Sequence, residues 1–245
     1  MSTVDLNAVD LNADLGEGFG RWSLGDDSGV MPFITSANVA CGFHAGDPQI
    51  MSATCALAVQ HGVIIGAHVS YPDLAGFGRR FIEIEPGELT AIVLYQIGAL
   101  EAIAAAAGTR VSYVKPHGAL YNAIVHHTAQ AEAVVEALRL HGGGLPLLGL
   151  PGSVAQHLAS TSGIRFVAEG FADRAYTDEG HLVPRGDPGA LITDPDAMAT
   201  QARRLVHHGI ESLCLHGDTP DAAHLAGALS AALEADGISL EPFVR

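Results

Sequence analysis

The sequence is poor in basic residues, in cysteine and in aromatic side chains. Only 12 of its 245 residues are Lys or Arg, against 27 Asp or Glu, which gives a formal net charge of −15. Nucleic acids and anionic membranes bind clusters of Lys and Arg, so we expect neither as a partner. The three cysteines are too few and too widely spaced for a disulfide framework or a zinc ribbon. We therefore expect reduced thiols and a cytoplasmic protein.

Long apolar runs and targeting signals are also missing. No apolar run reaches the roughly 18 residues that span a bilayer. No basic region followed by a hydrophobic block precedes residue 30, so the sequence shows no signal peptide. Apolar residues make up 48% of the chain, which is enough for a sizeable core. Without a linker or an internal repeat beyond the N-terminus, we expect one domain over residues 1–245.

Short apolar β-rich runs alternate with helical segments along the chain. Strands are predicted around Leu11 and over 34–41, 63–67, 111–115, 145–148, 164–168, 190–193 and 212–215. Helices are predicted from Asp47-Pro48 to His61, from near Pro86 to Gly108, from Asp194-Pro195 to Gly209 and from Thr219-Pro220 to Gly237. Uninterrupted apolar strands between helices indicate a parallel sheet with crossover helices, either open or closed into a barrel.

Polar residues follow nearly every predicted strand. In an open sheet they would gather at one switch point, whereas a barrel brings all strand ends to one rim, so their distribution favours a β/α barrel. No Gly-x-Gly-x-x-Gly follows the first strand, and no Walker-type phosphate loop occurs. The segment 171–188 lacks helical periodicity, and we interpret it as a hairpin or lid over the mouth.

The motif Val-Asp-Leu-Asn-Ala occurs twice, at 4–8 and at 9–13. We assign the second copy to the first core strand because a Gly-rich loop, 14–20, follows it directly. Asn12 and Asp14 then lie on the same face of that strand, since side chains alternate with period two. Burying acid and amide groups at a strand end destabilises the fold unless these groups are hydrogen-bonded or take part in binding or catalysis.

Lys115 is the only lysine, in a chain whose other cations are all arginines. It ends the predicted strand 111–115 and is followed by Pro116, His117 and Gly118, with Tyr121 in what resembles a first helical turn. An ammonium and an imidazole at a strand end are typical of an α/β active site. The alternative is a surface lysine left over in an arginine-rich chain.

The candidate site consists of the polar residues that follow the strands. They are Asn12, Asp14 and Glu17; Asn38, His44 and Asp47; His68, Ser70 and Asp73; Lys115, His117 and Tyr121; Glu169, Asp173 and Arg174; and His216 and Asp218. Carboxylate and histidine pairs are suited to acid–base catalysis. Lys115 and Arg174 are suited to holding an anionic substrate or a developing phosphate, and Arg79-Arg80 adds charge from another loop.

Each of these residues also has an ordinary structural interpretation. A single histidine near a strand end is more often a hydrogen-bonded structural residue than a catalyst. Cys41 would be a nucleophile only with a placed partner. Asp14, His44 and His68 would suit a divalent metal if they met in space, although no His-Glu-x-x-His motif occurs and no bound metal is predicted. The pairs His126-His127 and His207-His208 fall late in helices and are interpreted as surface residues.

At these residues the sequence resembles the LamB/YcsF family. The resemblance is carried in order by 9–17, 36–47, 66–68, 114–122, 171–174, 182–185 and 214–218, and so covers nearly the whole chain. One departure is Val69, where the family usually has Pro. The resemblance implies a single-domain α/β fold, a seven-stranded (β/α) barrel of the glycoside hydrolase/deacetylase type.

The resemblance also implies ATP-dependent opening of 5-oxo-L-proline to L-glutamate, with ATP and Mg²⁺ and in complex with B and C subunits. We assign catalysis to Asp14, His68, Lys115, His117 and Glu169. We assign substrate binding to Asn12, Glu17, Asn38, His44, Asp47, Tyr121, Asp173, Arg174, His216 and Asp218. Lys115→Ala or Asp14→Asn should lower turnover at least about 100-fold with the fold intact. The rival interpretations are a stand-alone metal-dependent deacetylase or amidohydrolase, and a subunit that binds substrate without catalysis.

Overall fold

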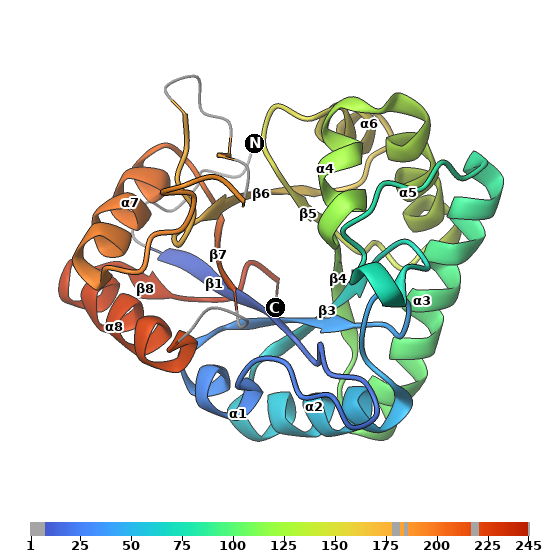
Figure 1. Cartoon of the computed structure of the whole chain (residues 1–245). Helices are drawn as coiled ribbons and strands as arrows, with labels where there is room; N and C mark the ends of the chain where they lie inside the picture. The colour runs from blue at the N-terminus through green and yellow to red at the C-terminus, as the bar shows by residue number, and fades with distance from the viewer. Residues whose placement is uncertain (1–7, 178–181, 184–185, 217–220, 245) are drawn as a thin grey trace.

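Seven parallel strands close into a barrel in the computed structural model, which describes residues 8–177, 182–183, 186–216 and 221–244 (Figure 1). The barrel strands are β1 (Ala8–Leu15), β2 (Ser36–Ala40), β3 (Ile64–Val69), β4 (Val111–Pro116), β5 (Leu147–Gly149), β6 (Phe166–Phe171) and β7 (Ser212–His216). Each pairs in parallel with the next, and β1 pairs with both β2 and β7. The closed barrel expected from the strand-end residues is therefore confirmed.

Helices flank the barrel on the left, below and on the right in Figure 1. They are α1 (Asp27–Val30), α2 (Pro48–His61), α3 (Pro86–Ala106), α4 (Gly118–His126), α5 (Thr128–His141), α6 (Val154–Thr161), α7 (Pro195–His207) and α8 (Ala222–Ala235), with short 3-10 turns η1 (Met31–Phe33) and η2 (Leu74–Gly76). Asp47 and Asp194 cap α2 and α7 as predicted, each followed by Pro at the first helical position.

Three secondary-structure predictions were wrong or incomplete. The predicted strand 190–193 is an irregular segment in which only Leu191 forms an isolated antiparallel bridge, to Arg174. An unpredicted short strand, β8 (Ser239–Leu240), pairs with the start of β1 outside the closed barrel. α8 begins at Ala222 with Asp221 before it, and the predicted cap Thr219-Pro220 lies outside the described residues.

Three helices, α1, α5 and α6, were not predicted. α5 starts directly after α4, with His127 as its N-cap, so His126-His127 marks a helix junction rather than one helix end. α6 is only 8 residues long and begins after Ser153, whose hydroxyl accepts from the N–H of Gln156. A short helix carries too few periodic apolar positions to stand out in the sequence.

α3 is the one helix in the described part of the chain that is long and apolar enough to cross a membrane by length and composition. Its fully buried apolar residues recur every three or four positions. They are Leu89, Val93, Ile97, Leu100 and Ala104. This face packs on β3, β4 and α5, which is how a helix covering a barrel buries one stripe.

The barrel interior near the amino end of β1 contains a buried acid. Asp10 is 1% exposed, and its carboxyl group is contacted by the hydroxyls of Thr35, Ser36 and Ser212. Burial raises the pKa of Asp10 to about 6 from 3.8, more than the hydrogen bonds from Ser212, Ser36 and Thr35 lower it. Folding therefore makes the carboxyl group of Asp10 harder to ionise than it is in the unfolded chain.

Asp10→Asn is expected to flatten the pH dependence of stability. Because the folded pKa is the higher one, the contribution of Asp10 is fully present below about pH 4 and is lost as pH rises through about 6. A difference of about two pKa units corresponds to about 3 kcal/mol. Urea unfolding from about pH 4.5 to about pH 7.5 measures it, with the exposed Asp196→Asn as control. Parallel curves for Asp10→Asn and the wild type would contradict a raised pKa.

Candidate active site

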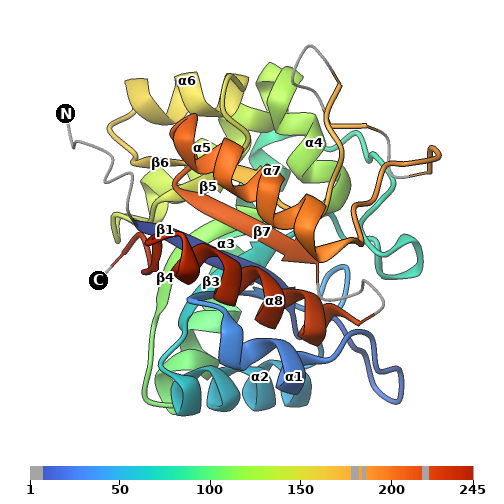
Figure 2. The ribbon, with the colours of Figure 1, turned by 90° about the vertical axis from the view of Figure 1, so that its left-hand side faces the viewer.

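A pocket of about 660 Å³ lies at the carboxyl ends of the barrel strands. The described parts of the loops after β1, β3 and β6 project from this same end of the barrel, on the right in Figure 2. Eight of the predicted site residues line the pocket, together with Arg79. They are Asp14, Glu17, His68, Lys115, His117, Tyr121, Arg174 and His216. Residues from both ends of the sequence thus share one cavity, as expected for a barrel rim.

Lys115 lies at the pocket floor and is only 2% exposed. Its Nζ is 2.9 Å from Asp14 Oδ1, 2.8 Å from Glu169 Oε1 and 3.1 Å from Asn12 Oδ1. Burial alone would lower the pKa of Lys115, but Asp14, Cys214 and Glu169 together raise it well above its ordinary value. The ammonium is therefore charged. It donates hydrogen bonds to Asn12, Asp14 and Cys214 and forms an ion pair with Glu169. The surface-lysine alternative is wrong.

The two carboxylates beside Lys115 differ in their access to the pocket. Asp14 lines it and also accepts from Asn38 Nδ2 at 2.8 Å. Burial would raise the pKa of Asp14, but His68 and Lys115 hold it well below its usual range. Glu169 is fully buried and accepts a 2.6 Å hydrogen bond from the hydroxyl of Tyr121. Asp14 is thus the carboxylate that can contact a substrate, whereas Glu169 forms a buried ion pair with Lys115 and does not line the pocket.

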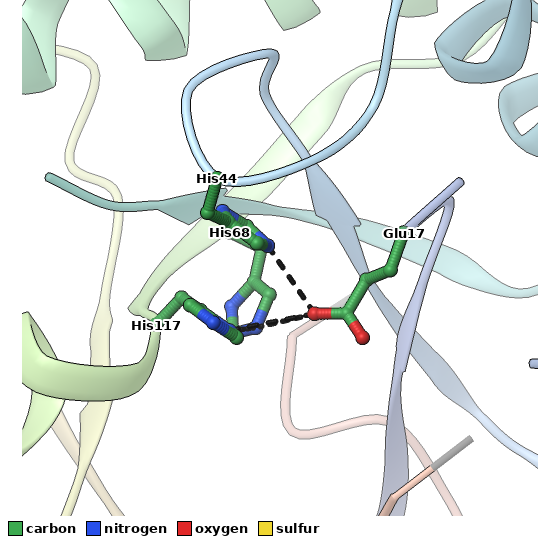
Figure 3. Close-up of side chains that lie close together, drawn as sticks. All are labelled: Glu17, His44, His68 and His117. Atoms are coloured by element: carbon green, nitrogen blue, oxygen red, sulfur yellow. Dashed lines mark hydrogen bonds and ion pairs between the residues drawn. The ribbon is translucent and has the colours of Figure 1, made fainter. Parts of the chain in front are cut away.

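Three imidazoles and a carboxylate converge on one wall of the pocket (Figure 3). Glu17 comes from the loop after β1, His44 from the loop after β2, His68 from β3 and His117 from the residue before α4. His44 does not line the pocket but stacks on His117, with ring centroids 3.7 Å apart. Burial, reinforced by the neighbouring histidines, lowers the pKa of both His44 and His117 well below the ordinary value.

At the carboxyl end of β7, Asp173 orients His216. The carboxylate of Asp173 accepts from the backbone N–H of His216 at 3.0 Å and lies 2.9 Å from its Nδ1. Because a carboxylate only accepts, Nδ1 of His216 carries the proton. Arg174 donates to the carbonyl of Val183 at 2.7 Å and also lines the pocket. This wall therefore combines an oriented imidazole with a guanidinium.

Three more predicted residues that the structure describes, Asn12, Asn38 and Asp47, do not line the pocket. Asn12 and Asn38 are buried beneath Lys115, and Tyr113 donates to Asn38 at 2.6 Å. Asp47 accepts from the backbone N–H groups of Gly20, Gln49 and Ile50, so its carboxylate fixes the start of α2 and does not face a substrate. The prediction that Asp47 binds substrate is not supported by this placement. Asp218 lies outside the described residues.

Asp73 and Arg80, in the loop after β3, hold each other in position. Asp73 caps η2 and forms an ion pair with Arg80, whose side chain is 65% exposed. Of the Arg79-Arg80 pair, only Arg79 lines the pocket. Ser70 is buried, and its hydroxyl donates to the carbonyl of Tyr71. The loop after β3 thus contributes one cation, Arg79, to the site.

Cys41 is not a nucleophile of this site. Its thiol is buried, does not line the pocket and contacts the carbonyl of Val39 at 3.2 Å. Burial raises the pKa of the thiol far above its ordinary value, which suppresses the reactive thiolate. The predicted hairpin after β6 is present in part, since Tyr176 and Leu182 form an antiparallel bridge and Leu182 and Val183 line the pocket.

Sequence reasoning missed two contributors to the site. Tyr113 shares a strand face with Lys115, and Phe171 lies 5.7 Å from the ammonium with its ring facing it. The period-two spacing of Tyr113 and Lys115 on β4 was a usable signal for the first. The spacing of Phe171 offered no such signal, because an apolar residue at a strand end is expected in any barrel.

A model of the LamB/YcsF family matches residues 9–245. The chain belongs to the LamB/YcsF family. Proteins named as the A subunit of 5-oxoprolinase are similar to this member over nearly their whole length. The one from Streptomyces avermitilis is 56% identical, covering 96% of this chain and 99% of the relative. The one from Kocuria rhizophila is 54% identical, covering 97% and 100%.

Solved structures agree with this LamB/YcsF assignment. The crystal structure of a lactam utilization protein from Thermus thermophilus has a TM-score of 0.91 at 43% identity, covering 96% of this chain and 100% of that chain. The catalytic domain of a peptidoglycan N-acetylglucosamine deacetylase from Eubacterium rectale has a TM-score of 0.55 at 10% identity, over 97% and 89%. The second likeness shows the fold alone, and it confirms the predicted deacetylase-type barrel.

Proposed function

We propose that this chain is the A subunit of an ATP-dependent 5-oxoprolinase, which opens the ring of 5-oxo-L-proline to give L-glutamate. Membership of the LamB/YcsF family and identities of 51% and 56% to two proteins named as the A subunit of 5-oxoprolinase support this function. The single observation that carries it is the pocket, where an accessible carboxylate, an oriented imidazole and two arginines meet. These are the groups needed to cleave an amide that carries a carboxylate.

The chemistry explains why ATP is needed. A five-membered lactam is a poor electrophile, and transfer of a phosphoryl group from ATP to its amide oxygen gives a reactive carbon and ADP. Water adds to that carbon, the C–N bond breaks, and the ring nitrogen takes up a proton. The resulting acyl phosphate is hydrolysed by a second water to glutamate and phosphate. We assign ring opening to this chain, and phosphoryl transfer with ATP and Mg²⁺ to partner B and C subunits.

The residues of the pocket fit roles in ring opening. Asp14, whose Oδ1 lies 2.9 Å from the ammonium of Lys115, is held ionised by that charge and is placed to accept the proton of the attacking water. As an imidazolium, with its Nδ1–H held by Asp173, His216 is placed to donate the proton on its Nε2 to the leaving nitrogen. Arg79 and Arg174 line the pocket and are suited to the substrate carboxylate or phosphate. Lys115 balances the charge of Asp14 and Glu169, which replaces its predicted role as a direct anion binder.

Glutamate release tests this function. The purified chain alone is expected to release no glutamate from 5-oxoproline and ATP, and the chain reconstituted with its B and C partners is expected to release it with stoichiometric ADP. Turnover by the chain alone on acetylated sugars would instead support a stand-alone deacetylase. Binding of 5-oxoproline with normal turnover by B and C in its absence would support a non-catalytic subunit.

We also propose that the complex works in the cytoplasm, where ATP is supplied. The cysteines agree with this location, because Cys41, Cys55 and Cys214 are all buried free thiols. Fractionation of cells expressing the untagged chain tests the location. Recovery of the chain in a periplasmic or membrane fraction would contradict it.

A further inference from the structure

The four side chains Glu17, His44, His68 and His117, hereafter the histidine cluster, are all buried and aim polar atoms at one point (Figure 3). Their exposed fractions are 6%, 0%, 1% and 5% in that order. One ligand atom from each side chain lies within 4.8 Å of every other. None of the roles proposed for ring opening uses Glu17, His44 or His117, so the function leaves the cluster unexplained.

Backbone carbonyl groups fix the outward-facing nitrogens of two of these imidazoles. Nδ1 of His68 lies 3.0 Å from the carbonyl oxygen of Lys115, and Nε2 of His117 lies 2.9 Å from that of Phe77. A carbonyl oxygen only accepts hydrogen bonds, so both outward nitrogens carry protons. In the neutral rings, the inward nitrogens, Nε2 of His68 and Nδ1 of His117, are then bare lone pairs.

These two lone pairs face each other at 3.0 Å. Two acceptors at that separation repel unless a positive charge lies between or beside them. The charge is either an additional proton, which would make one ring an imidazolium, or a metal ion. A metal ion would be shared by both lone pairs, by His44 and by Glu17, whose ligand atoms all lie within 4.8 Å of one another. Imidazoles held by backbone carbonyls are typical of metal ligands.

The spacing of the cluster fits an ion directly. Four ligands at about 2.0–2.1 Å from one tetrahedral ion lie about 3.3 Å from one another. Nε2 of His44 is 3.2 Å from Glu17 Oε1, and Nδ1 of His117 is 3.4 Å from the same oxygen. Nε2 of His68 is 3.9 Å from it. Two of these separations match the edge of such a tetrahedron, and the remaining ligand atoms, all within 4.8 Å of one another, would move inward to occupy its corners.

We propose that Glu17, His44, His68 and His117 form a binding site for a divalent transition-metal ion. Three imidazoles and one carboxylate are a ligand set that suits zinc, and the same set suits cobalt as a spectroscopic probe. Glu17, His68 and His117 also line the pocket, so the ion is reachable by a small molecule there. The site stands on its own geometry and does not depend on the proposed function.

Metal content tests the site without an activity assay. The full chain, freed of any affinity tag and dialysed after exposure to zinc, is expected to retain about one equivalent by mass spectrometry. Titration of the metal-free chain with Co²⁺ is expected to give the intense visible bands of a tetrahedral site. Retention below about a tenth of an equivalent, with no such bands, would overturn the proposal and favour a protonated imidazole pair.

Variants assign the bound metal to the cluster. His68→Asn and Glu17→Gln are each expected to lose the retained zinc and the cobalt bands, Glu17→Gln with little change of shape. His126→Gln is the matched control, because His126 is exposed at the other end of the helix that His117 precedes. Equal metal retention by Glu17→Gln, by His68→Asn and by the control would place the metal elsewhere and overturn the assignment, even if one variant folds poorly.

Discussion

Lys115→Ala is expected to lower the free energy of unfolding by about 3–5 kcal/mol, because it leaves two buried carboxylates without their cation. Asp14 and Glu169 lie 2.9 and 2.8 Å from the ammonium, and Glu169 is fully buried. From the sequence we expected this variant to lose turnover with the fold intact. The burial of Lys115 makes loss of stability the first consequence, and urea unfolding at neutral pH measures it.

A second variant separates charge from packing. Lys115→Met keeps most of the side-chain volume of Lys115 but removes its positive charge. Glu169→Gln removes the negative charge of the buried partner and keeps an oxygen that accepts from the hydroxyl of Tyr121. The double variant is expected to be more stable than Lys115→Met alone by about 1–3 kcal/mol. A loss below about 1 kcal/mol for Lys115→Ala would contradict a buried, desolvated ion pair.

Asp14→Asn is expected to lower glutamate release by the reconstituted complex about 100- to 10,000-fold, the usual contribution of a general base. The amide oxygen of Asn can still accept from Lys115 and Asn38, which now contact Oδ1 of Asp14. It cannot take up a proton from water at neutral pH. Initial rates of glutamate release at saturating ATP and 5-oxoproline measure the effect.

The matched control is Asp194→Asn, the same change at an exposed helix N-cap where Asn serves as well as Asp. It is expected to leave both turnover and the unfolding midpoint unchanged. The unfolding midpoint of Asp14→Asn is measured beside it, so that lost activity is not mistaken for lost fold. Turnover by Asp14→Asn within about 10-fold of the wild type would remove Asp14 from the role of base.

Much of the fold followed from local sequence patterns. Asp47-Pro48 and Asp194-Pro195 mark helix starts because capping is decided within one turn. Of the two Val-Asp-Leu-Asn-Ala copies, the second, at 9–13, lies in the first core strand, as predicted. The strand predicted over 190–193 was wrong because an apolar run of four residues fits a strand or an irregular segment equally well. Only pairing with a distant strand distinguishes the two.

The sequence by itself determined the family, the barrel and most of the residues at its rim, because motif spacing and strand alternation are local properties. Only the tertiary structure decided which rim residues face the pocket and which fix a loop, as with Asp14 and Asp47. It also placed Lys115 at the buried floor and set the lone pairs of His68 and His117 against each other. The physical reason is that charge, burial and tautomer depend on contacts between residues far apart in the chain, which no local pattern encodes.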